Sequence, residues 1–377
     1  MGYQQRHRRL RSLANQVISP CSSGRLHVDG AGAAPVPAGS IKTAATIDTI
    51  DISPWVNPQS STDAERAAVS RAVSASFERT GFALVIGHGV PNCVFDNVRA
   101  CAYAFFELPE ATKAKYSDGR GYGFGGYLDQ EENGAQLLGD FSRRGLGDHV
   151  ESVSLAENTG TGSSGISLAE SKGIGSSGNE QRPTTDGEPD YASETSRLVP
   201  PVTEAVSGFA TATERYFATM RSFSHTLDRL AEAALGLPPF GFGEVAKLDS
   251  GGGLRLAFYP DPAKRPPLPG QQRYGAHVDS GGITILKRDT ENPTGLQVCI
   301  DGQWVEVPSG ATAADSIVLN VGALLSRYTN NRWKASRHRV REIWPKSFFF
   351  RRLHNRNSRA EVVLVRDRLY AGPGAER

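Results

Sequence analysis

Long hydrophobic runs are missing from this chain of 377 residues, and so is an excess of charge of either sign. No apolar stretch approaches the roughly 18 residues that a membrane-spanning helix needs, so we expect no transmembrane helix. The 42 lysines and arginines nearly balance the 40 acids, which excludes the overall basic field that holds phosphate backbones. We therefore expect a soluble, monomeric globular protein with neither nucleic acid nor membrane as partner.

Cysteine is also scarce. None of the four cysteines belongs to a Cys-x-x-Cys pair or stands at a clustered metal-ligand spacing from a histidine. We therefore expect all of them to be reduced, partly buried thiols rather than a metal site. They are Cys21, Cys93, Cys101 and Cys299.

Acidic residues are absent from the first 28 positions, which contain five arginines. This composition is typical of an organellar transit peptide, although no clear amphipathic apolar stripe accompanies the arginines. The alternative is a disordered basic tail. We expect residues 1–45 to be a disordered or targeting tail on a cytoplasmic protein, with organellar import as the alternative. The arginines are Arg6, Arg8, Arg9, Arg11 and Arg25.

Helical and strand patterns begin near residue 46. Ile47, Ile50 and Ile52 alternate with polar residues, as in an edge strand. A capping box at Thr62 and Glu65 predicts a helix. Glycine and proline then separate further elements. The first helix is predicted to end at Gly81. A strand over Phe82–Ile86 follows, and then a second helix from about Asn92 that ends before Pro109.

The second half of the chain predicts one long helix followed by many short strands. Amphipathic spacing runs from Thr203 until Gly236 and Pro238 end it. Short apolar runs separated by turn residues then indicate a β roll. We expect a mixed α+β fold that is mainly β, a double-stranded β-helix (jelly roll) core braced by the N-terminal and central helices. The predicted strands are Leu254–Tyr259, Gly282–Leu286, Leu296–Ile300, Trp304–Val307, Ile317–Val321 and Glu361–Val365.

Composition divides the chain into four regions. Gly/Ser-rich runs that have almost nothing to bury predict a flexible insertion in the middle of the chain. The regions are a tail over residues 1–45, an N-terminal region over 46–150, the insertion over 151–202, and a helix with the β domain over 203–370.

The tripeptide His277-Val278-Asp279 is the sharpest chemical feature of the sequence. Side chains two residues apart in a strand point to the same face, where they can share one ion. His338 lies downstream, on a predicted strand, and supplies a second imidazole. Two imidazoles and one carboxylate on one side of a metal form the facial triad of non-haem Fe(II) oxygenases. Alone, a His-x-Asp is weak evidence, and surface or structural histidines are the alternative.

Several consecutive blocks around these residues resemble the Fe(II)/2-oxoglutarate-dependent dioxygenases, particularly the isopenicillin-N-synthase-like branch. Upstream, Gly81-Phe82 and Gly87–Pro91 resemble that family's N-terminal domain. The resemblance covers residues 46–150 and 203–366. The later blocks are Arg255–Pro260, Gly275–Leu286, Gly295–Val298, Gly302–Val307, Leu319–Gly322, Thr329-Asn330 and His338–Val340.

This resemblance implies an oxidoreductase whose metal and catalytic residues are His277, Asp279 and His338. It implies Fe(II) as cofactor, 2-oxoglutarate as co-substrate and dioxygen as oxidant. The implied reaction is hydroxylation of a small-molecule metabolite, or its desaturation or cyclisation. Two alternatives use the same fold. One is an oxidase that needs no 2-oxoglutarate, and the other is a catalytically impaired small-molecule-binding member.

The sequence departs from the family where the far carboxylate of 2-oxoglutarate is held. The family places an Arg-x-Ser pair shortly after the second histidine, and arginine suits a carboxylate because it donates two parallel hydrogen bonds. This chain has no Arg-x-Ser at that spacing. Arg351 or Lys346 is the candidate cation, with Ser347 and Tyr259 as hydroxyl donors. The alternative interpretation is that these residues are strand-end charges. The sequence also departs from the family's pattern at Ala257 and at Ala323.

Overall fold

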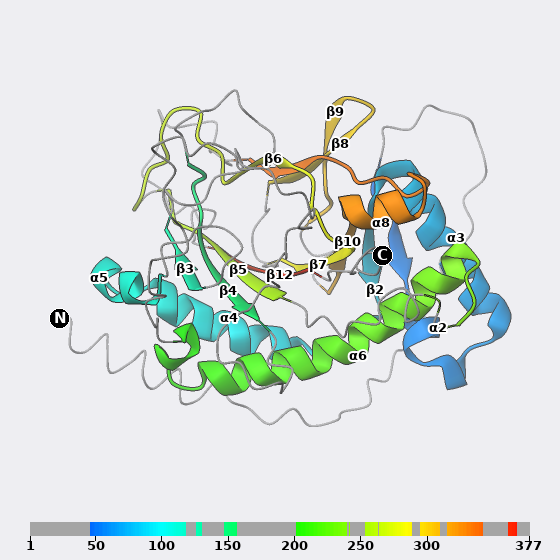
Figure 1. Ribbon diagram of the computed structural model, residues 1–377, viewed down its shortest axis with the longest axis horizontal. Helices are drawn as coiled ribbons and strands as arrows, with labels where there is room; N and C mark the ends of the chain where they lie inside the picture. Colours follow the sequence, from blue (N-terminus) through cyan, green and yellow to red (C-terminus); the bar gives the residue numbers. More distant parts are fainter. Residues whose placement is uncertain are drawn as a thin grey trace, which may run out of the picture.

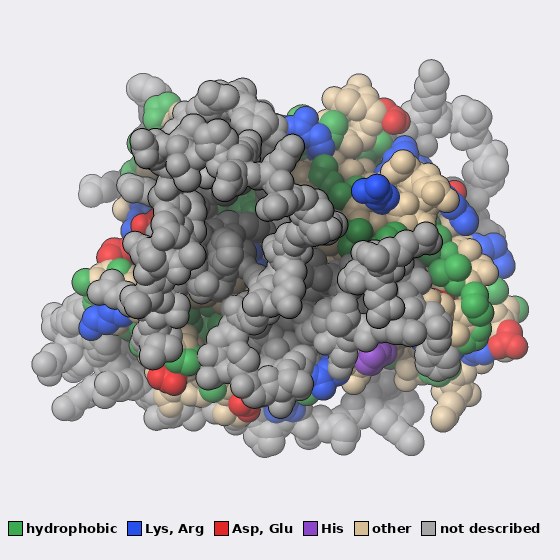
Figure 2. Space-filling view, in the orientation of Figure 1, with side chains coloured by type: hydrophobic (Ala, Val, Ile, Leu, Met, Phe, Trp, Pro, Cys, Tyr) green, Lys and Arg blue, Asp and Glu red, His purple; other side chains and the backbone are tan. Residues whose placement is uncertain are grey.

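The computed structural model describes residues 46–117, 126–129, 147–156, 201–239, 241, 253–262, 264–288, 295–309, 315–341 and 361–367. Within these ranges no helix is both long enough and apolar enough to cross a membrane. Basic and acidic side chains of the described residues are interspersed on the face shown in Figure 2.

The described elements form two β-sheets and a layer of helices. The helices are α2 (Ser53–Val56), α3 (Asp63–Thr80), α4 (Asn92–Phe106), α5 (Glu110–Lys113), α6 (Phe209–Leu235) and α8 (Ala323–Tyr328). The strands are β1 (Thr49–Asp51), β2 (Phe82–Ile86), β3 (Gly126–Leu128), β4 (Glu151–Ala156), β5 (Gly253–Tyr259), β6 (Tyr274–His277), β7 (Ile283–Lys287), β8 (Leu296–Ile300), β9 (Gln303–Glu306), β10 (Ile317–Val321), β11 (His338–Val340) and β12 (Glu361–Asp367).

Eight strands form the larger sheet, in the order β1-β2-β10-β7-β12-β5-β4-β3, and four form the smaller sheet, in the order β6-β11-β8-β9. Every pair is antiparallel except β1 with β2. Figure 1 shows α4 and α6 along one side of the larger sheet and the smaller sheet on its other side. The mixed α+β composition therefore agrees with the sequence prediction.

The larger sheet is apolar on both faces, because each face packs against another layer. In β2, Ala83 and Val85 join the core on the helix side. Their neighbours Phe82 and Leu84 pack with Val298 of β8 in the core between the sheets. Alternation along a strand explains this division, since successive side chains point to opposite faces. The same alternation decides which residues of β5, β7 and β10 can reach a site between the sheets.

Local signals fix the helix ends. The capping box at Thr62 and Glu65 is present, and Gly81 ends α3 in the left-handed region at φ 71°. Gly236 ends α6 in the same way. The long helix begins later than its predicted start at Thr203, because Gly208 takes a φ of 80°. That left-handed residue separates α6 from the short 3-10 turn Val202–Glu204.

Two sequence predictions need correction. Residues 151–156 were predicted to open the flexible insertion, but they form β4, paired residue by residue with β5. This stretch buries apolar surface at Val153, unlike the Gly/Ser runs that follow it in the sequence. Cys101 and Cys299 are free thiols, but Cys93 is disulfide-bonded, so the prediction of four reduced cysteines is wrong for Cys93. The remaining insertion (157–200) and the tail (1–45) lie outside the described residues.

Candidate metal centre

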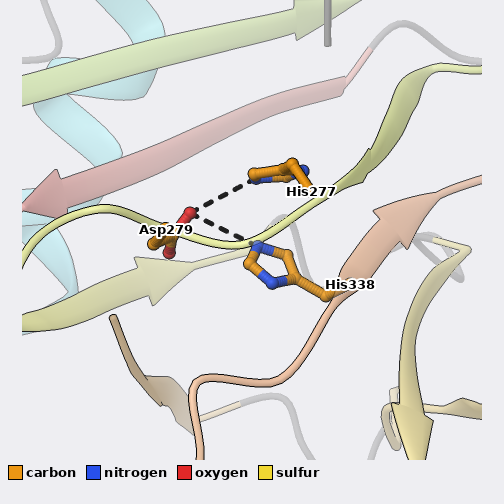
Figure 3. A group of neighbouring side chains, drawn as sticks. All are labelled: His277, Asp279 and His338. Carbon is orange, nitrogen blue, oxygen red and sulfur yellow. Dashed lines mark ion pairs between the residues drawn. The ribbon is translucent and has the colours of Figure 1, made fainter. Parts of the chain in front are cut away.

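The structure brings His277, Asp279 and His338 together. His277 ends β6 and His338 begins β11, and the two residues face each other in the antiparallel register of the smaller sheet. Nε2 of His277 lies 3.3 Å from Oδ1 of Asp279, and Nε2 of His338 lies 3.5 Å from the same oxygen. Figure 3 shows both rings directed at this carboxylate. One ligand atom from each residue thus lies within 4.8 Å of the other two.

The Nδ1 atoms of both histidines are held by backbone carbonyls. Nδ1 of His277 lies 2.9 Å from the carbonyl oxygen of Gly275. Nδ1 of His338 lies 3.2 Å from that of Ser336. A carbonyl only accepts, so each Nδ1 carries the proton and each Nε2 keeps its lone pair. This is the tautomer that a metal-ligating histidine needs, with the second nitrogen fixing the ring.

The two oxygens of Asp279 have different surroundings. Oδ2 accepts hydrogen bonds from Oγ1 of Thr284 at 2.6 Å and from Nδ2 of Asn320 at 2.7 Å. Thr284 on β7 and Asn320 on β10 are register partners in the larger sheet. Oδ1 therefore remains directed at the two imidazoles. The sequence prediction did not include Thr284 or Asn320, although both lie within the family-like blocks.

Burial and mutual charge shape the protonation of the site. Burial lowers the pKa of His277, and the nearby His338 lowers it further. Burial alone would raise the pKa of Asp279, but His338 and His277, when their rings are protonated, stabilise its carboxylate and hold this pKa well below its usual range. Neutral imidazole and ionised carboxylate are the forms that bind a cation.

The backbone after β6 is fastened to the helix that follows β10. The amide of Ala323 donates to the carbonyl of Asp279 at 2.7 Å, and that of Gly322 donates to the carbonyl of Gly282 at 2.7 Å. A Cβ on Gly322 would lie 2.3 Å from the carbonyl oxygen of Gly281. Glycine is thus required here by close backbone approach, and this contact positions the carboxylate of Asp279.

These donors fit a divalent transition metal. Two neutral imidazoles and one carboxylate converge from one side, each with its non-ligating atom hydrogen-bonded, as outer-shell partners of metal ligands are. This set, with coordination positions left on the opposite side, is the one that non-haem Fe(II) sites use. The geometry therefore favours a metal centre over structural histidines.

The residues predicted to hold 2-oxoglutarate are only partly described. Tyr259 ends β5 and is buried in a cluster with Val150, Ala257 and Tyr274. The guanidinium carbon of Arg273 lies 5.3 Å from the centre of the Tyr259 ring. Lys346, Ser347 and Arg351 lie outside the described residues.

Comparison with known proteins agrees with this geometry. Residues 47–164 match the family model described as non-haem dioxygenase in morphine synthesis N-terminal, and residues 252–351 match that of the 2OG-Fe(II) oxygenase superfamily. The chain is 29% identical over 313 residues to the 2-oxoglutarate-dependent dioxygenase citB of Monascus ruber, covering 80% of this chain and 82% of that protein.

Two further likenesses are more limited. Over 136 residues the chain is 37% identical to 1-aminocyclopropane-1-carboxylate oxidase 1 of Malus domestica, which covers 34% of this chain and 41% of that protein. The crystal structure of full-length Neurospora crassa T7H in complex with alpha-KG has a TM-score of 0.61 at 19% identity, covering 88% of this chain and 87% of that one. The structural likeness shows a shared fold.

Proposed function

The chain belongs to the Fe(II)/2-oxoglutarate-dependent dioxygenases, in their isopenicillin-N-synthase-like branch, and from that membership we propose that His277, Asp279 and His338 hold its catalytic iron. The enzyme is an oxidoreductase that couples decarboxylation of 2-oxoglutarate to oxidation of a substrate. The observation that carries the residue assignment is the convergence of two Nε2 atoms on one oxygen of Asp279.

The chain's own residues orient the reaction. Bound Fe(II) supplies the redox chemistry by which 2-oxoglutarate, dioxygen and a C–H group become succinate, carbon dioxide and a hydroxyl group. His277, Asp279 and His338 would hold the metal from one side, as the facial triad of non-haem Fe(II) oxygenases does. Thr284 and Asn320 hold the carboxylate of Asp279 in place.

The triad also supports a proposal for the fold. His277 and His338 come from the smaller sheet, whereas Thr284 and Asn320 come from the larger one. The site therefore lies between the two sheets. We propose that these sheets form the double-stranded β-helix expected from the sequence, with residues 46–156, which include β4, and residues 203–370 as the two regions that build the enzyme.

The substrate is proposed to be a small molecule. Solved structures of similar fold include T7H of Neurospora crassa in complex with thymine and JOX2 in complex with JA, each a small ligand of its own protein. Hydroxylation is the proposed outcome, and desaturation or cyclisation would need a substrate held in another orientation.

Tyr259 with Ser347 and Arg351 is the proposed contact set for 2-oxoglutarate. Its support is the burial of Tyr259 on the face of β5 that points between the sheets. Apparent 2-oxoglutarate affinity should fall about 10- to 100-fold in Arg351→Ala if Arg351 makes a charge-assisted contact. Lys346→Ala is the parallel test, and unchanged affinity in both variants would remove both residues as anchors.

The metal assignment is tested by equilibrium Fe(II) binding under anaerobic conditions. Wild-type protein should bind one Fe(II) per chain, and His338→Ala should lose tight binding. His225→Ala is a matched control, because the side chain of His225 is 63% exposed on α6. One tightly bound iron per chain in both variants would contradict the triad.

A further inference from the structure

The outer face of the smaller sheet carries three arginines at alternate positions. His338 points between the sheets, so Arg337, Arg339 and Arg341 point to the opposite face. Pairing with the β8 segment continues on both sides of β11, where the carbonyl of Arg337 accepts at 2.8 Å and the amide of Arg341 donates at 3.1 Å. Figure 1 shows α4 and α6 beyond the larger sheet, so neither helix covers this surface. We call these three arginines, together with Trp304 of β9, the arginine face.

Acidic side chains are few on the arginine face. Within the described residues, Glu306 is the only acid that pairs with any of the three arginines, and its Oε2 lies 3.8 Å from Nη2 of Arg341. The same oxygen accepts a hydrogen bond from Nε2 of Gln297 at 3.2 Å. Arg337 is exposed, and its side chain has no partner in the described part of the chain. Three positive charges thus meet one carboxylate that is already shared.

Neutral groups hold Arg339 at the centre of this face. Its Nε donates to Oε1 of Gln297 at 2.9 Å, and its guanidinium carbon lies 4.0 Å from the centre of the Trp304 ring. Neither Nη group of Arg339 donates to a described residue. A guanidinium can donate two parallel hydrogen bonds to one carboxylate, and a side chain fixed in advance loses less freedom when it does so. Arg339 is therefore the strongest anion-binding position on this face.

We propose that the arginine face binds an extended acidic segment of a partner protein, with its carboxylates at every second position. Side chains two residues apart in a strand are about 7 Å apart, and an extended peptide has the same repeat. Glutamate or aspartate at alternate positions therefore places one carboxylate opposite each arginine. The surface lies on the other side of β11 from His338, so the proposed contact is separate from the metal centre and adds to the proposed function.

Charge and the aromatic ring favour a peptide over nucleic acid or a membrane. Over the whole chain 42 basic residues nearly balance 40 acids, so no long-range field attracts a phosphate backbone. Basic clusters that recognise anionic lipids contain about 4 to 8 lysines and arginines, more than this face offers. Arg339 already lies over the ring of Trp304, where a nucleic-acid base would otherwise stack.

The test measures the binding of short fluorescent peptides to the full-length, Fe(II)-loaded protein by anisotropy in the absence of oxygen. The acidic probe alternates glutamate with threonine, and the neutral probe alternates glutamine with threonine. Wild-type protein should bind the acidic probe more tightly than the neutral one, and added salt should weaken this binding. The triple variant Arg337→Gln/Arg339→Gln/Arg341→Gln should bind the acidic probe about 10- to 100-fold more weakly.

A second triple variant is the matched control. Arg71→Gln/Lys115→Gln/Arg221→Gln removes the same charge from exposed positions outside the smaller sheet, so it should bind the acidic probe as wild type does. Arg339→Lys should lose less affinity than Arg339→Gln, because lysine keeps the charge but not the paired donors. Thermal unfolding of every variant checks that each remains folded.

A third probe tests the spacing. It has the composition of the acidic probe but carries its glutamates in adjacent pairs, and it should bind more weakly because neighbouring residues of an extended chain point to opposite sides. Equal binding of these two probes would overturn the strand-like mode of binding.

Three further results would overturn the site itself. They are equal binding of the acidic and neutral probes by wild type, an equal loss of affinity in the two triple variants, and binding of oligothymidine or of phosphatidylserine vesicles without binding of the acidic probe. The last result would assign the arginine face to nucleic acid or to a membrane instead of a peptide.

Discussion

At the scale of single residues, the two oxygens of Asp279 have separate roles in the proposed metal centre. Its Oδ1 is shared by the two imidazoles, while its Oδ2 is fully engaged by Thr284 and Asn320. A carboxylate held in this way cannot rotate without losing two hydrogen bonds, so its ligating oxygen stays in place when the metal is absent. This preorganisation reduces the ordering that metal binding must impose.

Removing one of these outer contacts should weaken the metal site without abolishing it. Asn320→Ala should lower Fe(II) affinity about 10- to 100-fold, and Thr284→Val should act in the same direction. Anaerobic titration with a competing chelator measures the change. Thr226→Val is the control, because the Thr226 hydroxyl bonds only locally on α6. Unchanged affinity in Asn320→Ala and Thr284→Val would show that the hydrogen bonds to Oδ2 do not support metal binding.

At this scale the sequence predicted the three clustered residues but not the side chains that support them. His277 and Asp279 stand two residues apart, and alternation along a strand is enough to place them together. The roles of Thr284 and Asn320 depend on the register between β7 and β10. Pairing partners that are distant in the chain leave no local pattern, which is why the sequence prediction missed both residues.

At the scale of elements, backbone hydrogen bonds from the start of α8 position the loop that follows β6 (residues 278–282). Gly322 approaches the loop backbone so closely that a side chain cannot fit between them. Most strands were predicted within one or two residues, since short apolar runs between turn residues define them. The start of α6 was not predicted, because the left-handed conformation of Gly208 sets it. The strand β4 was not predicted either, because it depends on pairing with β5.

Gly322→Ala should therefore displace the loop and lower both stability and Fe(II) affinity. The added Cβ meets a backbone oxygen, which cannot move aside as a flexible side chain would. We expect destabilisation on the order of 1 to 3 kcal/mol in chemical unfolding. Gly253→Ala is the matched control, because its Cβ would meet only a backbone oxygen at 4.0 Å. Equal stability and affinity in the two variants would contradict this role.

Over the whole molecule, a partly buried ionic cluster joins segments far apart in the chain, with Lys113 and Glu151 buried and Glu110 exposed. Nζ of Lys113 contacts Glu110 at 3.0 Å and Glu151 at 2.5 Å. Arg265 bridges the same two acids, at 2.8 Å and 2.6 Å. The hydroxyl of Tyr127 donates to Glu151 at 2.9 Å. The cluster thus fastens α5, β3 and β4 to the segment between β5 and β6, and no sequence motif indicated it.

Removing one charged partner from this cluster should lower the free energy of unfolding. Lys113→Met leaves the buried carboxylate of Glu151 without its nearest cation, which should cost about 3 to 5 kcal/mol of unfolding free energy. Lys115→Met, two residues away on the exposed side, should change stability little. The double variant Lys113→Met/Glu151→Leu should recover part of the loss. Equal free energies of unfolding for Lys113→Met and Lys115→Met would contradict a stabilising role for the cluster.

Acid should loosen the same cluster. Burial opposes the charged form of Glu110, but Lys113 and Arg265 outweigh it, so the pKa of Glu110 lies below its ordinary value of 4.5. A lowered carboxyl pKa adds stability that is complete above 4.5 and is lost as the pH falls through the folded-state pKa. Glu110→Gln should therefore reduce the difference in unfolding free energy between pH 6 and acid pH, measured by urea unfolding. A difference as large as in wild type would contradict this contribution.

Other whole-molecule predictions stay predictions. They are the tail over residues 1–45, the cytoplasmic location, the monomeric state and the insertion over residues 157–200. The mixed α+β composition could be predicted because periodicity reports on burial. Long-range pairing and buried charge networks could not, because they depend on the assembled structure.

Anaerobic titration of the Fe(II) protein with 2-oxoglutarate tests the central claim most directly. A metal-to-ligand absorption band should appear in wild-type protein and saturate at one 2-oxoglutarate per iron. It should be absent from Asp279→Ala, which lacks the shared ligand, and present in the control His225→Ala. Iron binding without this band in wild type would contradict 2-oxoglutarate dependence, and a band of full strength in Asp279→Ala would contradict the triad.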